Sequence, residues 1–552
     1  MTKLNELGKV VETDILVIGA GVGGCGAALA ARDKKAKVLL VDKGSFASCG
    51  QIGAGNANYH TFLHYADGDN AEEYSKFFGR DQESLSIPLY RRVIAERLLE
   101  MLKRIEAMGV ELHKNPDGKY RVDAGFGQTF PWNTTLANGK YVKRLISKGV
   151  RETGADIAEY VMITAILKDK NDGRAAGAIG FNVHTGESVI FRSKAMVMCL
   201  ASSNERFSNS CTNNPFNSWN YPFNTGSGPV MAYEAGAKVT AVESAKATML
   251  PWGLGTAGMM VYTSLGAYML NGKGERYMFK YHPKGERAPR QLSLLGTYAE
   301  ISEGRGPCYI DARHIAPDDI DFMINDRLYV EGNTFPEYFA QKGLDLRKEI
   351  MEIETGEING GGCVVVNNKL ESGVKGLFSY SPANMSAAMC AGYAACLEAL
   401  DYRKSSTGLP EVDVEQAAVQ KDKTLAPMKS KGDYSWREYE DVLRQIMNYY
   451  MGYIRSPEGM ETGLKKINHL AEHLKDIRAN NPHELARANE SAHLTKYCQL
   501  MIRSAMERKE SKRFCYKRMD YPELDPAWDG KYVVQWQEKG KPEITLQTMD
   551  VK

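Results

Sequence analysis

The stretch Asp14-Ile15-Leu16-Val17-Ile18-Gly19-Ala20-Gly21-Val22-Gly23-Gly24 decides the fold, because an apolar run leads directly into a glycine-rich turn. Such a run is typical of a buried parallel strand. The small residues from Cys25 to about Asp33 predict a helix, and residues 37–41 predict a second buried strand that ends at Asp42. These segments together predict a strand–turn–helix–strand unit of the α/β class.

This unit also predicts a dinucleotide-binding site. The glycines let the backbone approach a pyrophosphate, and the free N–H groups and positive end of the helix favour phosphate. Asp42 follows Gly24 by 18 residues, which is the place from which an acid accepts hydrogen bonds from a ribose diol. The alternative is a glycine turn that only packs a helix on a sheet.

The composition of the 552 residues is that of an ordinary large globular protein, with 70 Lys and Arg against 68 Asp and Glu. The net charge of +2 gives no support for nucleic acid or an anionic membrane as a partner. Two charge-free stretches, 207–233 and 247–272, contain many polar residues, so we expect no transmembrane segment. The chain start lacks a signal-peptide pattern, and the ten cysteines include no CxxC pair. We therefore expect a cytoplasmic protein with reduced thiols and no metal site.

Beyond the first unit, helices and strands alternate, and the pattern then becomes helical. The predicted helices are 72–109, 141–153, 229–235 and 385–400, and the predicted strands are 161–167, 175–182, 187–191 and 195–199. Residues 204–228 predict a long loop. Residues 413–515 are charged, poor in glycine and predicted helical, whereas 516–552 predict an aromatic, irregular tail.

The order of further motifs resembles the flavoprotein subunits of the fumarate reductase/succinate dehydrogenase superfamily, and most closely the adenylylsulfate reductase alpha-subunit branch. The resemblance covers nearly the whole chain. Its motifs, besides the opening stretch, are Gly53-Ala54-Gly55-Asn56-Ala57-Asn58, Thr225-Gly226-Ser227-Gly228, residues 231–237, Gly274-Glu275-Arg276-Tyr277, Ala288-Pro289-Arg290, Gly304-Arg305-Gly306-Pro307, residues 374–378, Glu510-Ser511-Lys512 and Asp520-Tyr521-Pro522.

The resemblance implies an α/β fold, α+β overall, in which a Rossmann-like FAD-binding domain carries an inserted capping domain and is followed by a C-terminal helical domain. We place the FAD-binding domain at 1–236 and 356–410, the capping domain at 237–355, the helical domain at 411–515 and the tail at 516–552. The implied activity is that of an FAD-dependent oxidoreductase with two-electron, hydride-type chemistry, as in fumarate reductase-like enzymes of anaerobic metabolism.

The resemblance also implies which residues hold the cofactor. Ser48-Cys49 stands where succinate dehydrogenases attach FAD to a histidine, so we expect non-covalent FAD. Asn384 is a predicted helix N-cap, and in the family that helix end faces the pyrimidine edge of the flavin. The implied cofactor-binding set is Gly19, Gly21, Gly24, Asp42, Lys43, Ser48, Gly50, Gly53, Asn56, Ala201, Ser227, Asn384, Met385 and Ser386.

Several substrate-binding motifs of the family are altered in this chain. The family's HPT motif falls on Leu250-Pro251-Trp252, and its HYTMGG motif falls near Glu357-Ile358-Asn359-Gly360-Gly361, so both histidines are absent. The arginine of the family's GANRLG motif has no counterpart. A dicarboxylate needs several cationic or hydrogen-bonding partners, so we expect a small polar or aromatic substrate other than fumarate or succinate.

The candidate active-site residues each have a second interpretation. Arg290 resembles the family's proton-shuttling arginine, or it is an ion-paired arginine in a basic run. His60 is a candidate flavin-side acid or base, or a packed histidine. Trp132 and Trp252 are candidates for an aromatic substrate wall, or for core packing. Asn224 belongs to an asparagine-rich stretch that predicts either a polar substrate lid or a set of turns.

The expected electron partner is a ferredoxin-like iron–sulfur subunit, in a heterodimer that could assemble further. The aromatic tail predicts a contact with that partner or with a second copy of this chain, or else packs on its own domain. Two other functions stay open. One is a self-sufficient NAD(P)H-linked flavin reductase, although a second glycine motif with its own strand and acid is absent. The other is a non-catalytic electron-relay subunit.

Overall fold

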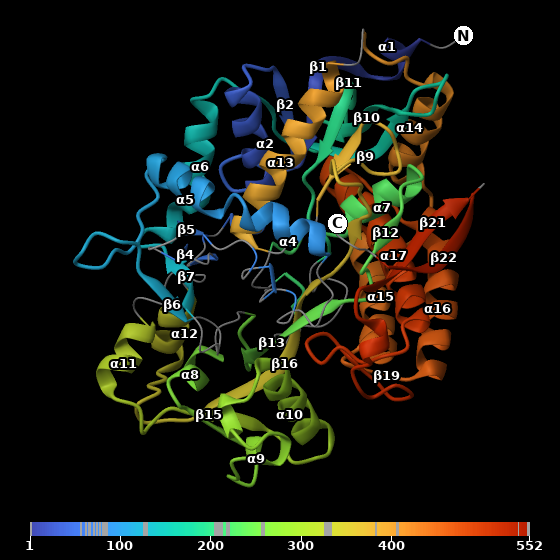
Figure 1. Ribbon diagram of the computed structural model, residues 1–552. Helices are drawn as coiled ribbons and strands as arrows, with labels where there is room; N and C mark the ends of the chain where they lie inside the picture. The colour runs from blue at the N-terminus through green and yellow to red at the C-terminus, as the bar shows by residue number, and fades with distance from the viewer. Residues whose placement is uncertain are drawn as a thin grey trace.

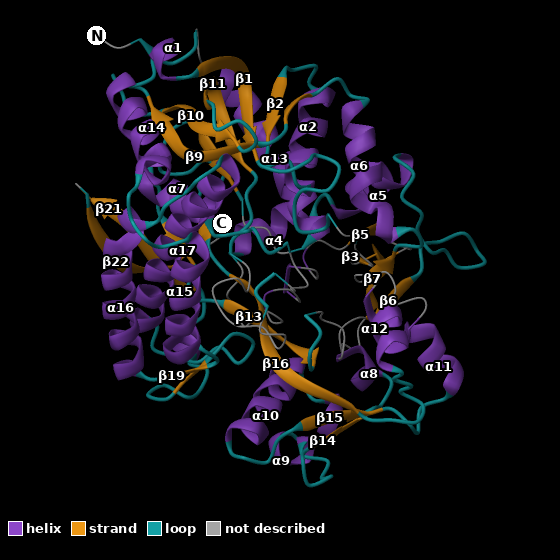
Figure 2. Cartoon of the chain, turned by 180° about the vertical axis from the view of Figure 1, so that it is seen from behind, coloured by secondary structure: helices purple, strands orange, loops and turns teal. Residues whose placement is uncertain are grey.

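The computed structural model describes residues 3–53, 55, 58–60, 63–64, 68–69, 72, 75–76, 79, 87–124, 131–203, 214–216, 221–255, 260–324, 334–380, 384–404, 408–538 and 540–548. Within these residues the chain forms a sheet-based body, a lobe at the lower end of Figure 1 and a bundle of helices along one side. Figure 2 shows the same three parts from behind.

A seven-stranded sheet forms the centre of the body, in the order β8-β2-β1-β11-β10-β9, with β18 paired to β11. β1 is parallel to β2 and β11, while β9 and β10 are antiparallel additions. The strands are β1 (Lys9–Ile18), β2 (Val38–Val41), β8 (Asp156–Ala158), β9 (Val161–Lys168), β10 (Ala175–Asn182), β11 (Ser188–Met198) and β18 (Leu377–Ser379). The predicted α/β unit at the start of the chain is therefore confirmed.

The strands predicted at 187–191 and 195–199 form one continuous strand, β11. The charged residues between them suggested a break, but each has a partner on β1. Arg192 pairs with Glu12 at 2.6 Å, and Lys194 pairs with Asp14 at 3.0 Å. The ladder to β1 thus continues past these residues to Met198.

Both faces of the sheet are covered, which explains the nearly uninterrupted apolar runs. Ile15 and Val17 belong to one core cluster, and Leu16 and Ile18 belong to another. The first face packs against α2 (Val22–Asp33) and α13 (Met385–Lys404). These helices touch backbone to backbone, since a Cβ on Gly392 would lie 2.1 Å from the Gly23 carbonyl oxygen.

The lobe contains the segment that was predicted to form the capping domain. Its sheet has the order β13-β16-β15-β14, made of β13 (Ala245–Pro251), β16 (Met351–Gly360), β15 (Cys308–Asp311) and β14 (Tyr268–Leu270). Its helices are α8 (Met260–Ser264), α9 (Met278–Tyr281), α10 (Arg290–Ser302), α11 (Pro317–Phe322) and α12 (Thr334–Lys342). Two long strands, β13 and β16, lead from the body into this lobe (Figure 1). The exact domain limits stay predictions.

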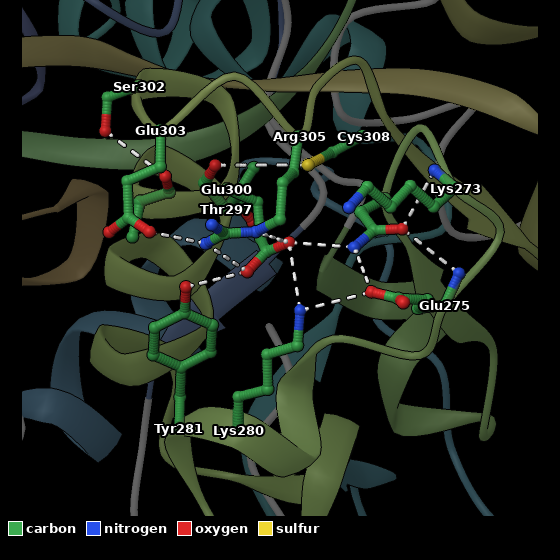
Figure 3. A network of polar contacts seen from close by, with 12 residues as sticks. Lys273, Glu275, Lys280, Tyr281, Thr297, Glu300, Ser302, Glu303, Arg305 and Cys308 are labelled. Atoms are coloured by element: carbon green, nitrogen blue, oxygen red, sulfur yellow. Dashed lines mark hydrogen bonds and ion pairs between the residues drawn. The ribbon is translucent and has the colours of Figure 1, made fainter.

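A buried carboxylate organises the lobe (Figure 3). Glu300 on α10 is fully buried and accepts hydrogen bonds from Arg305 at 2.8 and 2.9 Å, from Asn271 at 2.8 Å and from Tyr281 at 2.9 Å. Burial raises the pKa of Glu300, but the hydrogen bonds of Arg305, Asn271 and Tyr281 outweigh it and lower the pKa to about 2. The arginine of the Gly304-Arg305-Gly306-Pro307 motif is thus a structural residue.

The stretch predicted to be helical, 413–515, contains α14 (Val414–Lys429), α15 (Trp436–Met451), α16 (Pro457–Glu472) and α17 (Pro482–Glu507). Residues of α15, α16 and α17 join the core cluster on the second face of the central sheet. No described helix has the length and apolarity that a bilayer span requires.

The expectation of an irregular tail is wrong. Residues 531–538 and 541–548 form the hairpin β21 (Lys531–Glu538) and β22 (Lys541–Thr548), which completes a sheet in the order β17-β12-β21-β22. β12 (Val239–Thr240) and β17 (Cys363–Val364) flank the insertion of the lobe. Tyr532 is buried in the core of the body. The tail is thus a folded part of this chain.

The remaining elements are distributed over both faces of the sheet, since Ile94 and Ile146 belong to the first core cluster and Met231 to the second. The predicted helix 72–109 is described only in part, and that part is broken at Glu96-Arg97 into two helices. The elements are α1 (Leu4–Leu7), α4 (Pro88–Ala95), α5 (Leu98–Ala107), α6 (Val142–Arg151), α7 (Ser227–Glu234), β3 (Asn58–His60), β4 (Leu63–His64), β5 (Gly68–Asp69), β6 (Val122–Ala124), β7 (Pro131–Thr135), β19 (Ile454–Arg455) and β20 (Lys517–Arg518).

Candidate flavin site

The glycine turn lies where the parallel strands of the central sheet end. Gly19 follows β1 and has a φ of 97°, a conformation that favours glycine. A Cβ at Gly19 would lie 2.6 Å from the carbonyl oxygen of Cys199, the residue after β11. Carboxyl ends of parallel strands are the usual place for a ligand in an α/β fold.

Two loops, one at Gly19–Gly24 and one at Ser48–Gly53, approach each other closely at this edge at their glycines. A Cβ on Gly50, whose φ is 79°, would lie 2.9 Å from the Cα of Gly21. Gly24 packs the start of α2 on the turn, since its Cβ would lie 2.2 Å from the Gly19 carbonyl oxygen. Gly53 is also closely packed, because a Cβ there would lie 2.0 Å from the Ser48 carbonyl oxygen. The predicted cofactor glycines are therefore in one place.

The first turn of α2 has the donors that a diphosphate needs. Gly21 is the N-cap of this helix and has no side chain to cap it. Among the described residues, the N–H groups of Gly21, Val22 and Gly23 have no protein acceptor. Free N–H groups at a helix N-terminus bind phosphate groups. The residues present therefore fit the diphosphate of a dinucleotide.

Asp42 lies beside this turn. Its Oδ2 accepts a hydrogen bond from the Ala20 N–H at 2.8 Å, and its Oδ1 accepts one from the Gly44 N–H at 2.8 Å. A carboxylate oxygen can accept more than one hydrogen bond, so both oxygens keep capacity for ribose hydroxyls. The ribose role of Asp42 stays a prediction.

Lys43 is directed to the helical domain. Its Nζ lies 2.6 Å from Oε1 of the buried Glu490 on α17 and 2.5 Å from the Phe223 carbonyl oxygen. Arg487 also pairs with Glu490 and lies over the Phe223 ring at 3.8 Å. Lys43 thus anchors the segment before Thr225-Gly226.

Tyr221 is a residue that the sequence did not single out. Its hydroxyl would lie 3.9 Å from a Cβ placed on Gly44, next to Asp42. Burial, followed by the negative charges of Glu490 and Asp42, raises the pKa of Tyr221 to about 12. Only the fold brings this tyrosine to the side of the turn on which Asp42 lies, so no sequence spacing indicated it.

The Ser48-Cys49 pair contains no attachment histidine. Ser48 is exposed, whereas Cys49 is buried and donates a hydrogen bond to the Ala20 carbonyl oxygen at 3.2 Å. Burial, with the nearby charge of Asp42, raises the pKa of the Cys49 thiol. A protonated thiol is a poor nucleophile, so a redox role for Cys49 has no support.

The second wall of the site comes from the described residues 199–203 and 221–228. Ala201 follows β11, and its carbonyl oxygen would lie 3.5 Å from a Cβ on Gly228. Asn224 has a buried Nδ2 group that has no partner among the described residues. Ser227 begins α7, and its hydroxyl lies 2.9 Å from Nδ1 of His493. Burial lowers the pKa of His493, which therefore stays neutral.

Asn384 caps α13 as the sequence predicts. Its Oδ1 accepts hydrogen bonds from the Ala387 N–H at 2.8 Å and from the Ser386 hydroxyl at 2.7 Å. Met385 and Ser386 are buried at the start of this helix. α13 packs on α2, so its N-terminus belongs to the same side of the sheet as the glycine turn. Asn56 lies outside the described residues.

The predicted active-site residues are dispersed over the lobe and its border. Arg290 begins α10, half-buried, with its guanidinium 4.4 Å from the Phe514 ring centre. Trp252 lies on the turn after β13 and is 48% exposed. His60 ends β3 and Trp132 lies on β7, two strands that pair with each other. The side chains of His60 and Trp132 are outside the described residues.

Two of the altered family motifs adjoin on the β13–β16 pair. Leu250 begins the first, Gly356 directly precedes the second at Glu357–Gly361, and a Cβ on Gly356 would lie 2.5 Å from Leu250 Cδ1. Leu250 is paired with Glu354, which shares a strand face with Gly356. Glu354 is half-buried with no hydrogen-bond or ion-pair partner among the described residues, and burial raises its pKa.

The described part of the chain offers no metal-binding group of three or more His, Cys, Asp or Glu residues. The nine described cysteines are buried thiols without disulfides.

Known proteins resemble this chain in sequence and in fold. The family described as FAD binding domain matches residues 14–496. One component of the fumarate reductase (CoM/CoB) of Methanothermobacter marburgensis is 25% identical over 94% of this chain and 96% of its own. The alpha chain of adenylylsulfate reductase from Megalodesulfovibrio gigas is 30% identical over 55% of this chain and 50% of its own.

A solved structure extends the likeness to the complete fold. Adenylylsulfate reductase from Archaeoglobus fulgidus superposes with a TM-score of 0.85, at 23% identity, over 99% of this chain and 97% of the other. The glycine turn and free helix N-terminus described above lie inside the matched FAD-binding region. The chain therefore belongs to the FAD-binding flavoprotein family and is an FAD-dependent oxidoreductase of the fumarate reductase and adenylylsulfate reductase superfamily.

Proposed function

We propose that this chain is the flavoprotein subunit of a two-component oxidoreductase. It holds FAD non-covalently, acts on a small polar or aromatic substrate other than a dicarboxylate, and exchanges electrons with an iron–sulfur protein. FAD, when bound, accepts or donates two electrons and a proton. The residues of this chain bind that cofactor, shape the substrate site and move the proton.

One observation carries the need for a partner. The described cysteines are dispersed single thiols, and no described cluster could hold a metal centre. Electrons that reach the flavin and do not enter a substrate must therefore leave to another protein. An iron–sulfur protein is one class of carrier that takes electrons one at a time, and it is the class that the resemblance implies.

The lobe supports the substrate class. Leu250 fills the space beside Gly356, so an apolar group lies next to the segment in which the family's second histidine motif is altered. Glu354 adds a carboxyl group on the same strand face. An apolar wall and a carboxyl group disfavour a dianion, because neither supplies a cation to pair with a second carboxylate. Arg290 stays our candidate for holding one anionic or polar group and for moving the proton.

Non-covalent attachment is tested directly. Acid precipitation of the purified protein should release its yellow chromophore into the supernatant, because neither Ser48 nor Cys49 supplies the histidine link. Flavin that stays on the washed pellet contradicts this part of the proposal.

The substrate and partner are tested on the purified holoprotein. The flavin is reduced anaerobically with a stoichiometric amount of dithionite, and its reoxidation is followed after mixing with fumarate, adenylylsulfate or an oxidised ferredoxin. We expect fast electron transfer to the ferredoxin and none to fumarate. Fumarate comes first because a relative carries that activity in its name, and fast reoxidation by fumarate overturns the substrate class.

Two further arms separate the alternatives. Rapid reduction of the oxidised flavin by NADH or NADPH alone would show a self-sufficient reductase and overturn the need for a partner. Exchange with ferredoxin but with no compound of a broad panel of unsaturated, sulfur and aromatic substrates would indicate an electron-relay subunit.

A further inference from the structure

A buried lysine lies beneath the glycine turn. Lys143 on α6 is only 1% exposed. Its ammonium group donates to the Phe46 carbonyl oxygen at 2.6 Å, the Ser147 hydroxyl at 2.8 Å and the Ala20 carbonyl oxygen at 3.1 Å. It also lies 4.3 Å from the centre of the Phe46 ring. Its donors are thus directed at neutral oxygens.

Among the residues that the structure describes, the charge of this lysine has no direct counterion. Within the described residues, Lys143 forms no ion pair with a carboxylate. Asp42 is linked to Lys143 only through Ala20. The Asp42 carboxylate accepts a hydrogen bond from the Ala20 N–H, and Lys143 donates one to the Ala20 carbonyl oxygen. Removing an ammonium group from water without a paired anion is costly. A bound anion nearby would offset that cost.

The lysine also fixes the orientation of one peptide group. In a trans peptide the C=O and the following N–H point in opposite directions. Because Lys143 holds the Ala20 carbonyl oxygen, the Gly21 N–H is directed to the other side of the turn. That N–H, with those of Val22 and Gly23, has no protein acceptor among the described residues. Lys143 therefore acts on the first of the donors at the start of α2.

We propose that Lys143 is a positioning residue of the FAD diphosphate site. It holds the Ala20–Gly21 peptide so that Gly21 N–H faces the diphosphate, and its buried charge adds positive potential beneath the turn. The inference rests on FAD binding by this chain and assigns no contact between Lys143 and the cofactor.

The test compares ligands with and without a diphosphate. The full-length protein is freed of flavin, and the affinities for FAD, ADP and adenosine are measured by competition against FAD fluorescence quenching. In Lys143→Met, we expect ADP and FAD to bind about 10- to 100-fold more weakly, the size of one charge-assisted interaction. Adenosine affinity should not change, because it lacks the diphosphate.

The matched control is Lys148→Met, which removes an exposed charge from the same helix and should change none of the three affinities. Equal weakening of ADP and adenosine in Lys143→Met would show that Lys143 only supports packing. Unchanged ADP affinity would show that the turn is held without it. Either result overturns the proposal.

A second variant covers the case in which the methionine variant does not fold. Lys143→Gln keeps an amide donor but removes the charge, and the same ADP-selective loss is expected. Full ADP affinity in a folded Lys143→Gln protein overturns the electrostatic role. If the unaltered protein itself binds neither FAD nor ADP, the FAD assignment fails instead, so the two failures are distinct.

Discussion

Gly21 meets Gly50 through the backbone, so it is the position at which a side chain can block the cofactor and spare the fold. A Cβ on Gly21 would lie 3.5 Å from the Gly50 Cα, an ordinary contact. We expect Gly21→Asp to fold but to lose FAD, because its carboxylate would meet the diphosphate at the free helix N-terminus.

The ratio of flavin absorbance to protein absorbance and the thermal melting curve measure these two effects. Gly24→Asp is the contrasting variant, since a Cβ there would lie 2.2 Å from a backbone oxygen. It should lower the melting temperature as well as flavin content. Full flavin content in Gly21→Asp would contradict the placement of the diphosphate.

Arg290 tests the active-site half of the proposal. Arg290→Ala should lower turnover with the true substrate by about 10²- to 10⁴-fold, the range for loss of a proton donor or acceptor. Flavin content should stay unchanged, because Arg290 lies in the lobe, away from the glycine turn. The exposed Arg287 is the matched control, and Arg287→Ala should turn over normally. Normal turnover of Arg290→Ala would contradict the assigned role.

Single residues were predictable from the sequence where their constraint is local. Gly19, Gly21 and Gly24 serve a turn and helix start that lie next to each other in the chain. The salt bridge between Lys43 and Glu490 joins residues 447 positions apart, so no spacing indicates it. The role of Lys143 was not predicted for the same reason, because only the fold brings α6 beneath the turn.

At the scale of elements, α10 depends on the buried carboxylate of Glu300. Glu300→Gln should lower the free energy of unfolding by about 3 kcal/mol, since it leaves Arg305 without its buried partner. The control is Glu303→Gln, which removes an exposed partner of the same arginine and should cost less than about 1 kcal/mol. Urea unfolding of the four proteins, wild type, the two single variants and the double variant, measures both values.

The same carboxylate sets a pH dependence with a defined sign. The pKa of Glu300 is lowered from its ordinary value of 4.5 to about 2. Its contribution to stability is therefore complete above about pH 4.5 and is lost as the pH falls towards 2. The stability of Glu300→Gln should fall less steeply over this range than that of the wild type. Parallel curves would contradict the role of this carboxylate.

The N-terminus of α13 offers a test of flavin electrostatics. Asn384→Ala removes the cap and should fray the first turn at a cost of about 1 kcal/mol. A weaker positive helix end stabilises the reduced, anionic flavin less, so its midpoint potential should fall by about 10 to 20 mV. Asn481→Ala, which removes the cap of α17, should lower stability equally and leave the potential unchanged.

Spectroelectrochemical titration of the holoproteins measures the midpoint. An unchanged potential in Asn384→Ala would show that this helix end is remote from the flavin ring.

Helices and strands were predictable from the sequence where a single local signal determines them. The cap at Asn384 and the helix after it were predicted, because a capping side chain and a small-residue run are both local. The continuity of β11 was not, because Arg192 and Lys194 break the apolar run, and only their partners on β1 reconcile them with a strand.

The whole molecule differs from expectation most in its tail. β21 lies between β12 and β22, and its Tyr532, Val533 and Val534 are buried. Arg508, at the end of α17, joins buried Glu243 at 2.6 Å and Glu510 at 2.8 Å. The sequence indicated an irregular tail because its strands mix aromatic and charged residues. In addition, the pairing of β21 with β12 joins residues almost 300 positions apart, which local sequence patterns do not indicate.

We therefore expect the tail to stabilise the fold of this chain, whether or not it also contacts a partner. We expect a chain that ends after Cys515 to lose several kcal/mol of stability and its FAD, because it loses the buried Tyr532, Val533 and Val534 and the pairing of β21 with β12. This reverses the simpler expectation that the shortened chain would keep FAD and lose only a partner. Thermal melting and flavin content of the purified shortened chain give the result.

A chain that ends after Gly540 is the matched control, since it keeps β21 and removes β22, whose described side chains near its start are exposed. It should keep its flavin and most of its stability, so any loss of an iron–sulfur partner in this variant would assign the contact to β22. If the chain that ends after Cys515 instead melts normally with full FAD, the tail is an independent attachment, and the partner contact first inferred from its aromatic residues regains its place.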